Sequence, residues 1–311
     1  MRDAFPLIGQ GENIEMKTMS FERFDREALD EILEDVLPYS EMSFNEKYFL
    51  NGIVRFLKPR KVLEVGVSSG GGTAIILNAI HDRKEARLIS VDYMEQAYKY
   101  PNRKSGFIIE EKFPEFMGSW NIYRGGDVSA FIEKIGADID LAVIDTMHLH
   151  PWETLNFLCI LPFLSKSAWV VLHDIVMHYS DRRSLACKYL FDLVVSERKE
   201  TPPPDSVPLF ANIGAFQVEE NTHKYVENLF GGLSLPWACE IKGEDLESVS
   251  RILSSYYPEE LCDVFKKSIA FQDKMRKNIT LYSYLKEFMM IFTPKIFKTF
   301  QSLKRKFKFR Y

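Results

Sequence analysis

Residues 61–74 read KVLEVGVSSGGGTA, and this stretch constrains the fold of the 311-residue chain more than any other. Its apolar first half predicts a buried strand, and residues 73–80 predict a helix. The turn between them holds four glycines: Gly66, Gly70, Gly71 and Gly72. Glycine lets a ligand approach the main chain, and the start of a helix attracts a carboxylate or phosphate. We therefore expect a nucleotide-type ligand at the carboxyl end of the first strand of an α/β sheet.

Composition narrows the class of protein. A chain of 311 residues with 46% hydrophobic content can bury one full core, with or without appendages. The net charge of −4 does not indicate a general nucleic-acid-binding surface. The four cysteines form no C-x-x-C pair, which argues against a zinc ribbon or disulfide framework and suits the reduced thiols of the cytoplasm. Residues 1–16 lack the apolar core of a signal peptide, and no apolar run is long enough to span a membrane.

Helices are predicted before the first strand. Residues 21–36 carry apolar side chains at helical spacing, and residues 1–18 are expected to form a loose arm. Ser43 and Glu46 match a capping box at the start of a second helix, predicted over residues 44–57.

The second predicted strand, residues 88–91, ends at Asp92. A carboxylate here can accept both ribose hydroxyls, because two O–H donors match its two oxygens. Tyr93 is placed to lie on one face of an adenine. A third strand over residues 121–124 leads into a turn that holds Asp127. That side chain is a candidate for a helix N-cap.

The fourth and fifth predicted strands end in polar side chains. Residues 141–144 and 168–172 are buried in this prediction. Four groups follow them: Asp145, His148, His173 and Asp174. Adjacent parallel strands would bring these groups to one rim, where open α/β sheets carry out their chemistry. A late strand is predicted over residues 213–218.

Three connecting segments are also predicted. Residues 96–118 indicate a loop and a short helix, and residues 165–167 a turn. A helix is expected over residues 182–196, before an exposed proline-rich loop.

Several of these motifs occur together in one family. Glu64, Gly66 and Gly70 form E-x-G-x-x-x-G, which resembles motif I of class I S-adenosylmethionine-dependent methyltransferases. Acid-x-x-His after the fourth strand and His-Asp after the fifth resemble the group that includes sugar and antibiotic O-methyltransferases. The resemblance covers roughly residues 40–220. It implies a Rossmann-like, doubly wound, mainly parallel seven-stranded sheet with an antiparallel late strand, N-terminal helices and a helical C-terminal extension.

The resemblance also implies site residues. Those expected to hold the cofactor are Glu64, Gly66, Gly70, Asp92, Tyr93 and Asp127. Asp127 would reach the adenine amino group, with the N-cap role as the alternative. His148 is the expected general base, with Asp145 and Asp174 as catalytic partners.

In some members of the group, acids at these places bind magnesium. The candidate ligands here are Asp145, His173 and Asp174. Ile175 follows Asp174 where the metal-dependent catechol-type enzymes have an amide, and magnesium prefers oxygen to imidazole. Metal dependence is therefore left open, and a hydrogen bond that holds the loop is the alternative role for His173.

The sequence thus predicts an enzyme that transfers a methyl group from S-adenosylmethionine to oxygen on a small molecule or sugar, in surface-polysaccharide or natural-product biosynthesis. The alternatives are an NAD-dependent oxidoreductase, which the glycine spacing fits less well, and a non-catalytic binding protein.

The predicted division is an arm and helix over residues 1–40, the methyltransferase domain over 41–220, and a helical extension over 221–311. The extension ends in a basic, aromatic tail: Lys295, Phe297, Lys298, Phe300, Lys304, Arg305, Lys306, Phe307, Lys308, Arg310 and Tyr311. The tail predicts contact with anionic lipid or a partner, with a solvated terminus as the alternative. The expected location is the cytoplasm, with peripheral contact at the inner membrane surface and homo-oligomer formation left open.

Overall fold

Seven strands form the central sheet of this computed structural model, which describes residues 20–181, 183–204, 210–278 and 293. The strands are β1 (Lys61–Val65), β2 (Arg87–Asp92), β5 (Trp120–Arg124), β6 (Ile139–Ile144), β7 (Leu164–His173), β8 (Lys199–Glu200) and β9 (Ile213–Gln217). Their order is β5-β2-β1-β6-β7-β9-β8. The first five strands in that order run parallel, and β9 pairs antiparallel with β7 and with β8. The predicted fold is therefore confirmed, including the antiparallel late strand.

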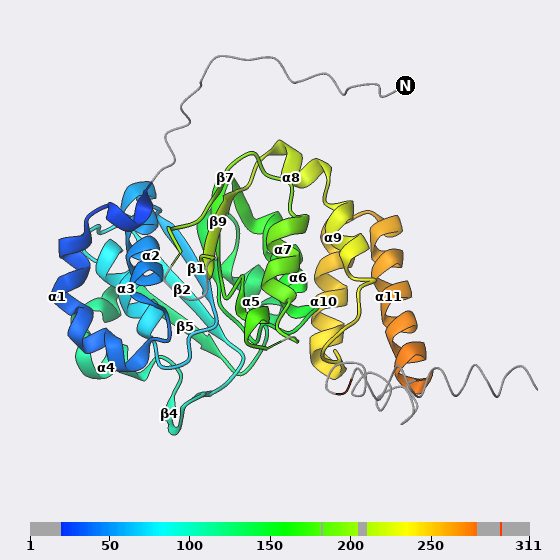
Figure 1. The fold of residues 1–311 in the computed structure, drawn as a ribbon, viewed down its shortest axis with the longest axis horizontal. Coiled ribbons are helices and arrows are strands. Elements are labelled where there is room, and N and C mark those ends of the chain that lie inside the picture. The colour runs from blue at the N-terminus through cyan, green and yellow to red at the C-terminus, as the bar shows by residue number, and fades with distance from the viewer. Residues whose placement is uncertain (1–19, 182, 205–209, 279–292, 294–311) are drawn as a thin grey trace, which may run out of the picture.

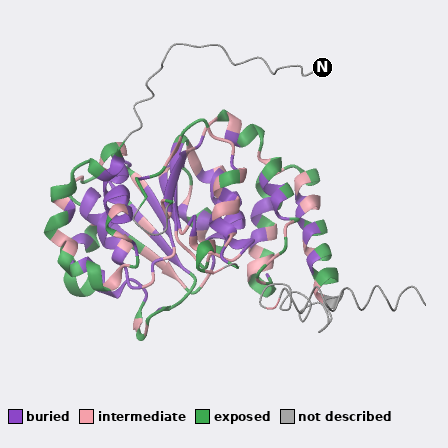
Figure 2. Cartoon of the chain, viewed as in Figure 1, coloured by how far each residue is buried: buried purple, intermediate pink, exposed green. Residues whose placement is uncertain are grey.

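Helices cover both faces of this sheet (Figure 1). One face carries α1 (Arg26–Val36), α2 (Phe44–Leu57) and α3 (Gly71–Ile80), and the other carries α5 (Val128–Ile135), α6 (Trp152–Ile160) and α7 (Ala186–Leu193). Each face has its own hydrophobic cluster: the first lies between the sheet and α1, α2 and α3, and the second between the sheet and α5, α6 and α7. Along β1, Val62 belongs to the first cluster, whereas Leu63 and Val65 belong to the second. The central strands β1 and β6 are almost entirely buried (Figure 2), as expected for a parallel sheet between helical layers, whereas most residues of the edge strands β5 and β8 are half-buried.

The chain before and after the predicted domain joins the same two clusters. Phe21 packs edge-on against Phe49 of α2 and Trp169 of β7, at ring-centroid distances of 5.7 and 5.9 Å. After α8 (Glu220–Lys224), the helices α9 (Glu227–Gly232), α10 (Gly243–Tyr256) and α11 (Glu259–Asn278) add apolar side chains to the second cluster. Hydrophobic packing therefore crosses both predicted boundaries, and the division at residues 40 and 220 stays a proposal.

Three expectations about connecting segments were wrong or incomplete. Residues 96–118 contain a hairpin, β3 (Gln96–Ala97) and β4 (Tyr100–Lys104), before α4 (Phe107–Lys112) and the 3₁₀ helix Pro114–Ser119. The hairpin was missed because most residues of β4 are exposed and lack an apolar alternation.

Residues 165–167 belong to β7 and do not form a separate turn. Leu164 pairs with Ile139 and Trp169 with Leu141, so the intervening residues bulge out of the ladder. The helix predicted over residues 182–196 is shorter in the structure than expected: α7 begins at Ala186 and ends at Leu193.

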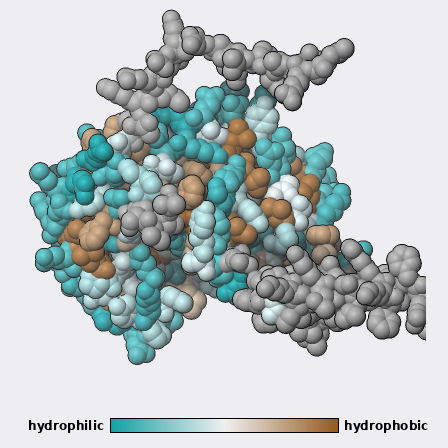
Figure 3. Space-filling view, viewed as in Figure 1, coloured by the Kyte–Doolittle hydropathy of each residue, from teal (hydrophilic) through white to brown (hydrophobic). Residues whose placement is uncertain are grey.

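The predicted arm and basic tail lie outside the described residues. None of the helices in the described ranges is both long and apolar enough to cross a membrane. On the face seen in Figure 3, hydrophobic side chains form separate patches within a largely hydrophilic surface.

The capping box at the start of α2 is confirmed. The Ser43 hydroxyl accepts from the Glu46 N–H at 3.3 Å, and the Glu46 Oε2 accepts from the Ser43 N–H at 2.6 Å. The two bonds satisfy free donors at the helix terminus and hold the Glu46 side chain beside the sheet edge.

We predict that Ser43→Ala lowers the free energy of unfolding by about 1 kcal/mol, the usual cost of losing a side-chain N-cap. Urea denaturation followed by circular dichroism measures this change. Ser255→Ala is the matched control, because the exposed Ser255 hydroxyl donates to the Arg251 carbonyl of its own helix and caps no helix terminus. Equal unfolding midpoints for the two variants would contradict the prediction.

Candidate active site

The glycine turn is shaped by contact between strand ends. Gly66 has φ +95°, and a Cβ there would stand 1.8 Å from the Asp145 carbonyl oxygen. The Gly66 N–H donates to Val91 O and the Asp145 N–H to Val65 O, both at 2.8 Å. Gly70, with φ +102°, precedes α3 and brings no side-chain cap. Backbone geometry thus accounts for glycine at residue 66, while the cofactor role of Gly66 and Gly70 stays a prediction.

Glu64 is enclosed within the protein, with 3% of its surface exposed. Its carboxyl accepts from Thr73 Oγ1 at 2.9 and 3.0 Å and from Ser90 Oγ at 2.6 Å. Burial raises the pKa of Glu64 to about 8, against the opposing effect of these two hydroxyls. Ser90 Oγ also accepts from the Trp120 indole at 2.9 Å. The network connects β1, α3, β2 and β5, and the cofactor contact of Glu64 stays a prediction.

Asp92 holds the glycine turn against the end of β2. Its Oδ2 accepts from the N–H groups of Val67 and Ser68, at 3.1 and 2.8 Å, and from Ser105 Oγ at 2.6 Å. Its Oδ1 accepts from the Met94 N–H at 2.8 Å. The ribose prediction assumed two available oxygens, whereas Oδ2 already has three donors, so the geometry favours Oδ1 for a ribose hydroxyl.

Tyr93 and Asp127 lie in different environments. Tyr93 is 53% exposed, and its ring centroid stands 6.5 Å from that of Trp152. Asp127 is buried, and its Oδ1 accepts from the Ser129 N–H at 2.9 Å at the start of α5. Burial raises the pKa of Asp127. The predicted N-cap is confirmed, and the adenine contact of Asp127 stays a prediction.

The four polar groups at the carboxyl ends of β6 and β7 meet at one edge of the sheet. His148 Nε2 lies 3.0 Å from Asp174 Oδ2 and 3.7 Å from Asp145 Oδ1. His173 Nδ1 lies 3.1 Å from the same Asp145 oxygen, and its Nε2 lies 3.3 Å from Glu46 Oε2 on α2. The expectation that these side chains share a rim is therefore correct.

Charge pairing dominates this rim. Burial disfavours the charged imidazoles, but the carboxylates outweigh it and raise the pKa of His148, and that of His173 well above its ordinary value. Burial also opposes ionisation of Asp174, yet the hydrogen bond from His148 and the charges of both histidines lower the pKa of Asp174 to about 2. The structure therefore favours imidazolium–carboxylate pairs.

Residues 63–175, which contain both strand-end motifs, match a family model described as a methyltransferase domain. The match identifies residues 63–175 as a methyltransferase domain. The strand order and the antiparallel β9 agree with this assignment. No curated protein matches the sequence.

Solved methyltransferase structures resemble the chain at low identity. The O-methyltransferase TomG from Streptomyces achromogenes, solved with S-adenosylmethionine, is 15% identical, with a TM-score of 0.45 over 66% of this chain and 92% of that one. An O-methyltransferase from Bacillus cereus is 16% identical, with a TM-score of 0.43 over 66% and 93%. The Podospora anserina methyltransferase PaMTH1 is 14% identical, with a TM-score of 0.44 over 62% and 88%. Likeness at this level does not assign an activity.

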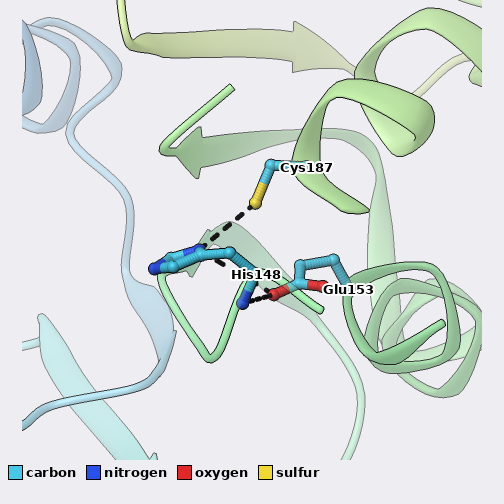
Figure 4. Close-up of side chains that lie close together, drawn as sticks. All are labelled: His148, Glu153 and Cys187. Atoms are coloured by element: carbon cyan, nitrogen blue, oxygen red, sulfur yellow. Dashed lines mark hydrogen bonds and ion pairs between the residues drawn. The ribbon is translucent and has the colours of Figure 1, made fainter. Parts of the chain in front are cut away.

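The methyltransferase domain contains supporting residues that the sequence patterns did not identify. Glu153, fully buried on α6, accepts from the Thr146 hydroxyl at 2.8 Å and from the His148 N–H at 2.5 Å. Figure 4 shows Glu153 directed at that backbone nitrogen and the His148 ring directed at Cys187, whose Sγ lies 3.6 Å from Nδ1. The only local signal for Glu153 was an acid in the helix that follows His148.

Two further supports of the rim come from distant segments. Asn212 Nδ2 donates to Asp174 Oδ1 at 2.5 Å, although the two residues are 38 positions apart. Glu46 belongs to the capping box of α2, and that pattern carries no information about its contact with His173.

Two groups of possible metal ligands lie among the described residues, with ligand atoms within 4.8 Å of one another. One comprises Asp145, His148 and Asp174, and the other His148, Glu153 and Cys187. The sequence instead suggested His173 beside the two acids. Both ring nitrogens of His173 already face carboxylates, so its role as a ligand stays a prediction, and the geometry favours His148.

Glu64 is expected to make stability depend on pH. Its pKa is about 8 in the folded protein against an ordinary value of 4.5, so the folded state holds this proton more tightly than the unfolded chain does. The stability that Glu64 contributes is fully present below pH 4.5 and is lost as pH rises toward 8, by at most about 1.4 kcal/mol per unit.

Glu64→Gln, which stays neutral, should therefore gain stability relative to the parent protein between pH 5 and pH 8, by roughly 1–4 kcal/mol. Urea unfolding of both proteins at the two pH values measures the difference. The same pH dependence in the two proteins would show that Glu64 is ionised in the folded state.

Proposed function

We propose that the protein transfers the methyl group of S-adenosylmethionine to a hydroxyl oxygen of a small molecule, such as a sugar of a surface polysaccharide or natural product. The observation that carries this proposal is the placement of His148 Nε2 3.0 Å from Asp174 Oδ2 and 3.7 Å from Asp145 Oδ1, at the carboxyl edge of a methyltransferase sheet.

The residues around the glycine turn fit the cofactor. The first turn of α3 has no side-chain cap, so its N–H groups are suited to the carboxylate of the cofactor's methionine part. Asp92 Oδ1 can accept from a ribose hydroxyl, and the exposed ring of Tyr93 offers a face to adenine. When bound, S-adenosylmethionine supplies a methyl group on a sulfonium centre. The chain's task is to hold this group in line with the acceptor oxygen, which is the main source of rate enhancement in such a transfer.

His148 is the proposed general base. A hydroxyl is a weak nucleophile at neutral pH, and His148 can remove its proton when the imidazole is neutral. The carboxylates raise the pKa of His148, so this neutral form becomes more abundant as the pH rises. Asp145 and Asp174 stabilise the imidazolium that results, as their effect on the pKa of His148 indicates. Glu153 fixes the backbone of His148 and acts as a positioning residue.

The same rim fits a divalent cation. Asp145 and Asp174 would supply oxygen ligands, with an imidazole from His148 or His173 as the third, and water would complete the shell. A bound cation would lower the pKa of the acceptor hydroxyl. Activity that survives EDTA would favour His148 alone, whereas loss with EDTA and recovery with Mg²⁺ or Mn²⁺ would favour the metal.

The remaining parts of the proposal concern the setting of the protein. We propose a cytoplasmic location, with contact between the basic tail and the inner membrane surface. Formation of a homo-oligomer belongs to the same proposal. The family match makes an oxidoreductase the less favoured alternative.

His148→Ala and Asp174→Ala should each lower turnover by roughly 10²–10⁴-fold, the range for loss of a general base, and change the Kd of S-adenosylmethionine much less. Transfer of radiolabelled methyl to a panel of hydroxylated sugars and a metabolite extract measures turnover, and titration calorimetry measures Kd. His223→Ala serves as the control, because His223 is exposed on α8. Normal turnover in both site variants would remove the catalytic assignment.

A further inference from the structure

A residue of the C-terminal helices contacts the expected adenine side of the cofactor site. The Tyr93 hydroxyl donates to Asp245 Oδ2 at 3.0 Å, across 152 positions of sequence. Tyr93 follows Asp92 at the end of β2, and Asp245 lies in the first turn of α10. The family match ends at residue 175, so α10 lies outside the matched region.

The position of α10 is set by contacts that are independent of Tyr93. The guanidinium of Arg251 pairs with Glu133 on α5, and its Nη2 donates to the Ser129 carbonyl at 3.3 Å. Tyr257, which directly follows α10, donates its hydroxyl proton to the Leu158 carbonyl of α6 at 2.6 Å. Figure 1 shows α10 beside these helices. Asp127 is the N-cap of α5, and α10 is bonded to α5. The position of α10 is therefore fixed relative to the expected adenine side of the site.

The pairing also limits the movement of an exposed ring. Tyr93 is 53% exposed, so without a partner its ring would sample several rotamers. Trp152 lies on one side, with 6.5 Å between ring centroids, and Asp245 holds the hydroxyl. The hydrogen bond to Asp245 raises the pKa of Tyr93, so the phenol keeps the proton that it donates.

We propose that Asp245 is a positioning residue of the cofactor site: it holds the Tyr93 ring in the orientation against which adenine stacks, so that α10 is part of the site. The inference rests on the proposed function, because it assumes that S-adenosylmethionine binds over β1 and β2. A ring that is already ordered removes part of the entropic cost of binding.

The test compares the loss of the hydroxyl with the loss of its acceptor. Tyr93→Phe keeps the ring, and Asp245→Ala removes the acceptor. We expect each variant to weaken binding of S-adenosylhomocysteine by about 3–10-fold in titration calorimetry, and the double variant to show no further loss, because both changes remove one interaction. The same loss is expected for 5′-methylthioadenosine, which keeps the adenosine part and lacks the amino-acid end.

Glu244→Ala is the matched control, since Glu244 is an exposed acid in the same first turn of α10 and should leave both dissociation constants unchanged. Thermal unfolding checks that each variant is folded, and Tyr93→Phe alone tests the inference if Asp245→Ala does not fold. Unchanged binding in the single variants, additive losses in the double variant, or a loss confined to S-adenosylhomocysteine would overturn the inference. Absence of S-adenosylhomocysteine binding by the unmodified protein would instead contradict the proposed function.

Discussion

The site depends on the close approach of two strand ends. A methyl group at Gly66 would stand 1.8 Å from the Asp145 carbonyl oxygen, so only glycine lets the ends of β1 and β6 lie as they do. The Asp145 N–H also donates to Val65 O at 2.8 Å, and this bond joins the same two strand ends. The main chain itself therefore fixes the glycine turn of the proposed cofactor site relative to the first carboxylate of the rim. Asp92 then ties the rest of the turn to β2 through the N–H groups of Val67 and Ser68.

The features that could be predicted from the sequence are those whose parts lie close together along the chain. The capping box spans four residues, and the positions of the main strands along the chain followed from apolar segments, several of them ended by a polar group. The hairpin at residues 96–104 escaped prediction because its short strands pair only with each other and are largely exposed. The bulge at residues 165–167 depends on the register with β6, which no local pattern encodes.

Partners of the site residues could not be predicted, because they come from distant segments. Glu46 and His173 are 127 positions apart, and each belongs to a local pattern that suggests another role. Two buried charges brought together cost desolvation energy, which their attraction offsets only with good geometry. Such a pair contributes little net stability, so its presence at this edge agrees with a functional rim. The packing of α2 and β7 decides this contact, and the residue types alone do not.

Backbone strain at the rim supports the same conclusion. His148 and Asp174 both have φ 59°, a left-handed conformation that costs non-glycine residues about 1–3 kcal/mol. Each is restrained by a buried or partly buried partner: Glu153 accepts from the His148 N–H, and Asn212 donates to Asp174 while its own side-chain oxygen accepts from the Val176 N–H. These bonds compensate the strain and aim the two side chains at each other. A rim ordered in this way before a ligand arrives needs little rearrangement during the reaction, which is the main requirement for electrostatic stabilisation of a transition state.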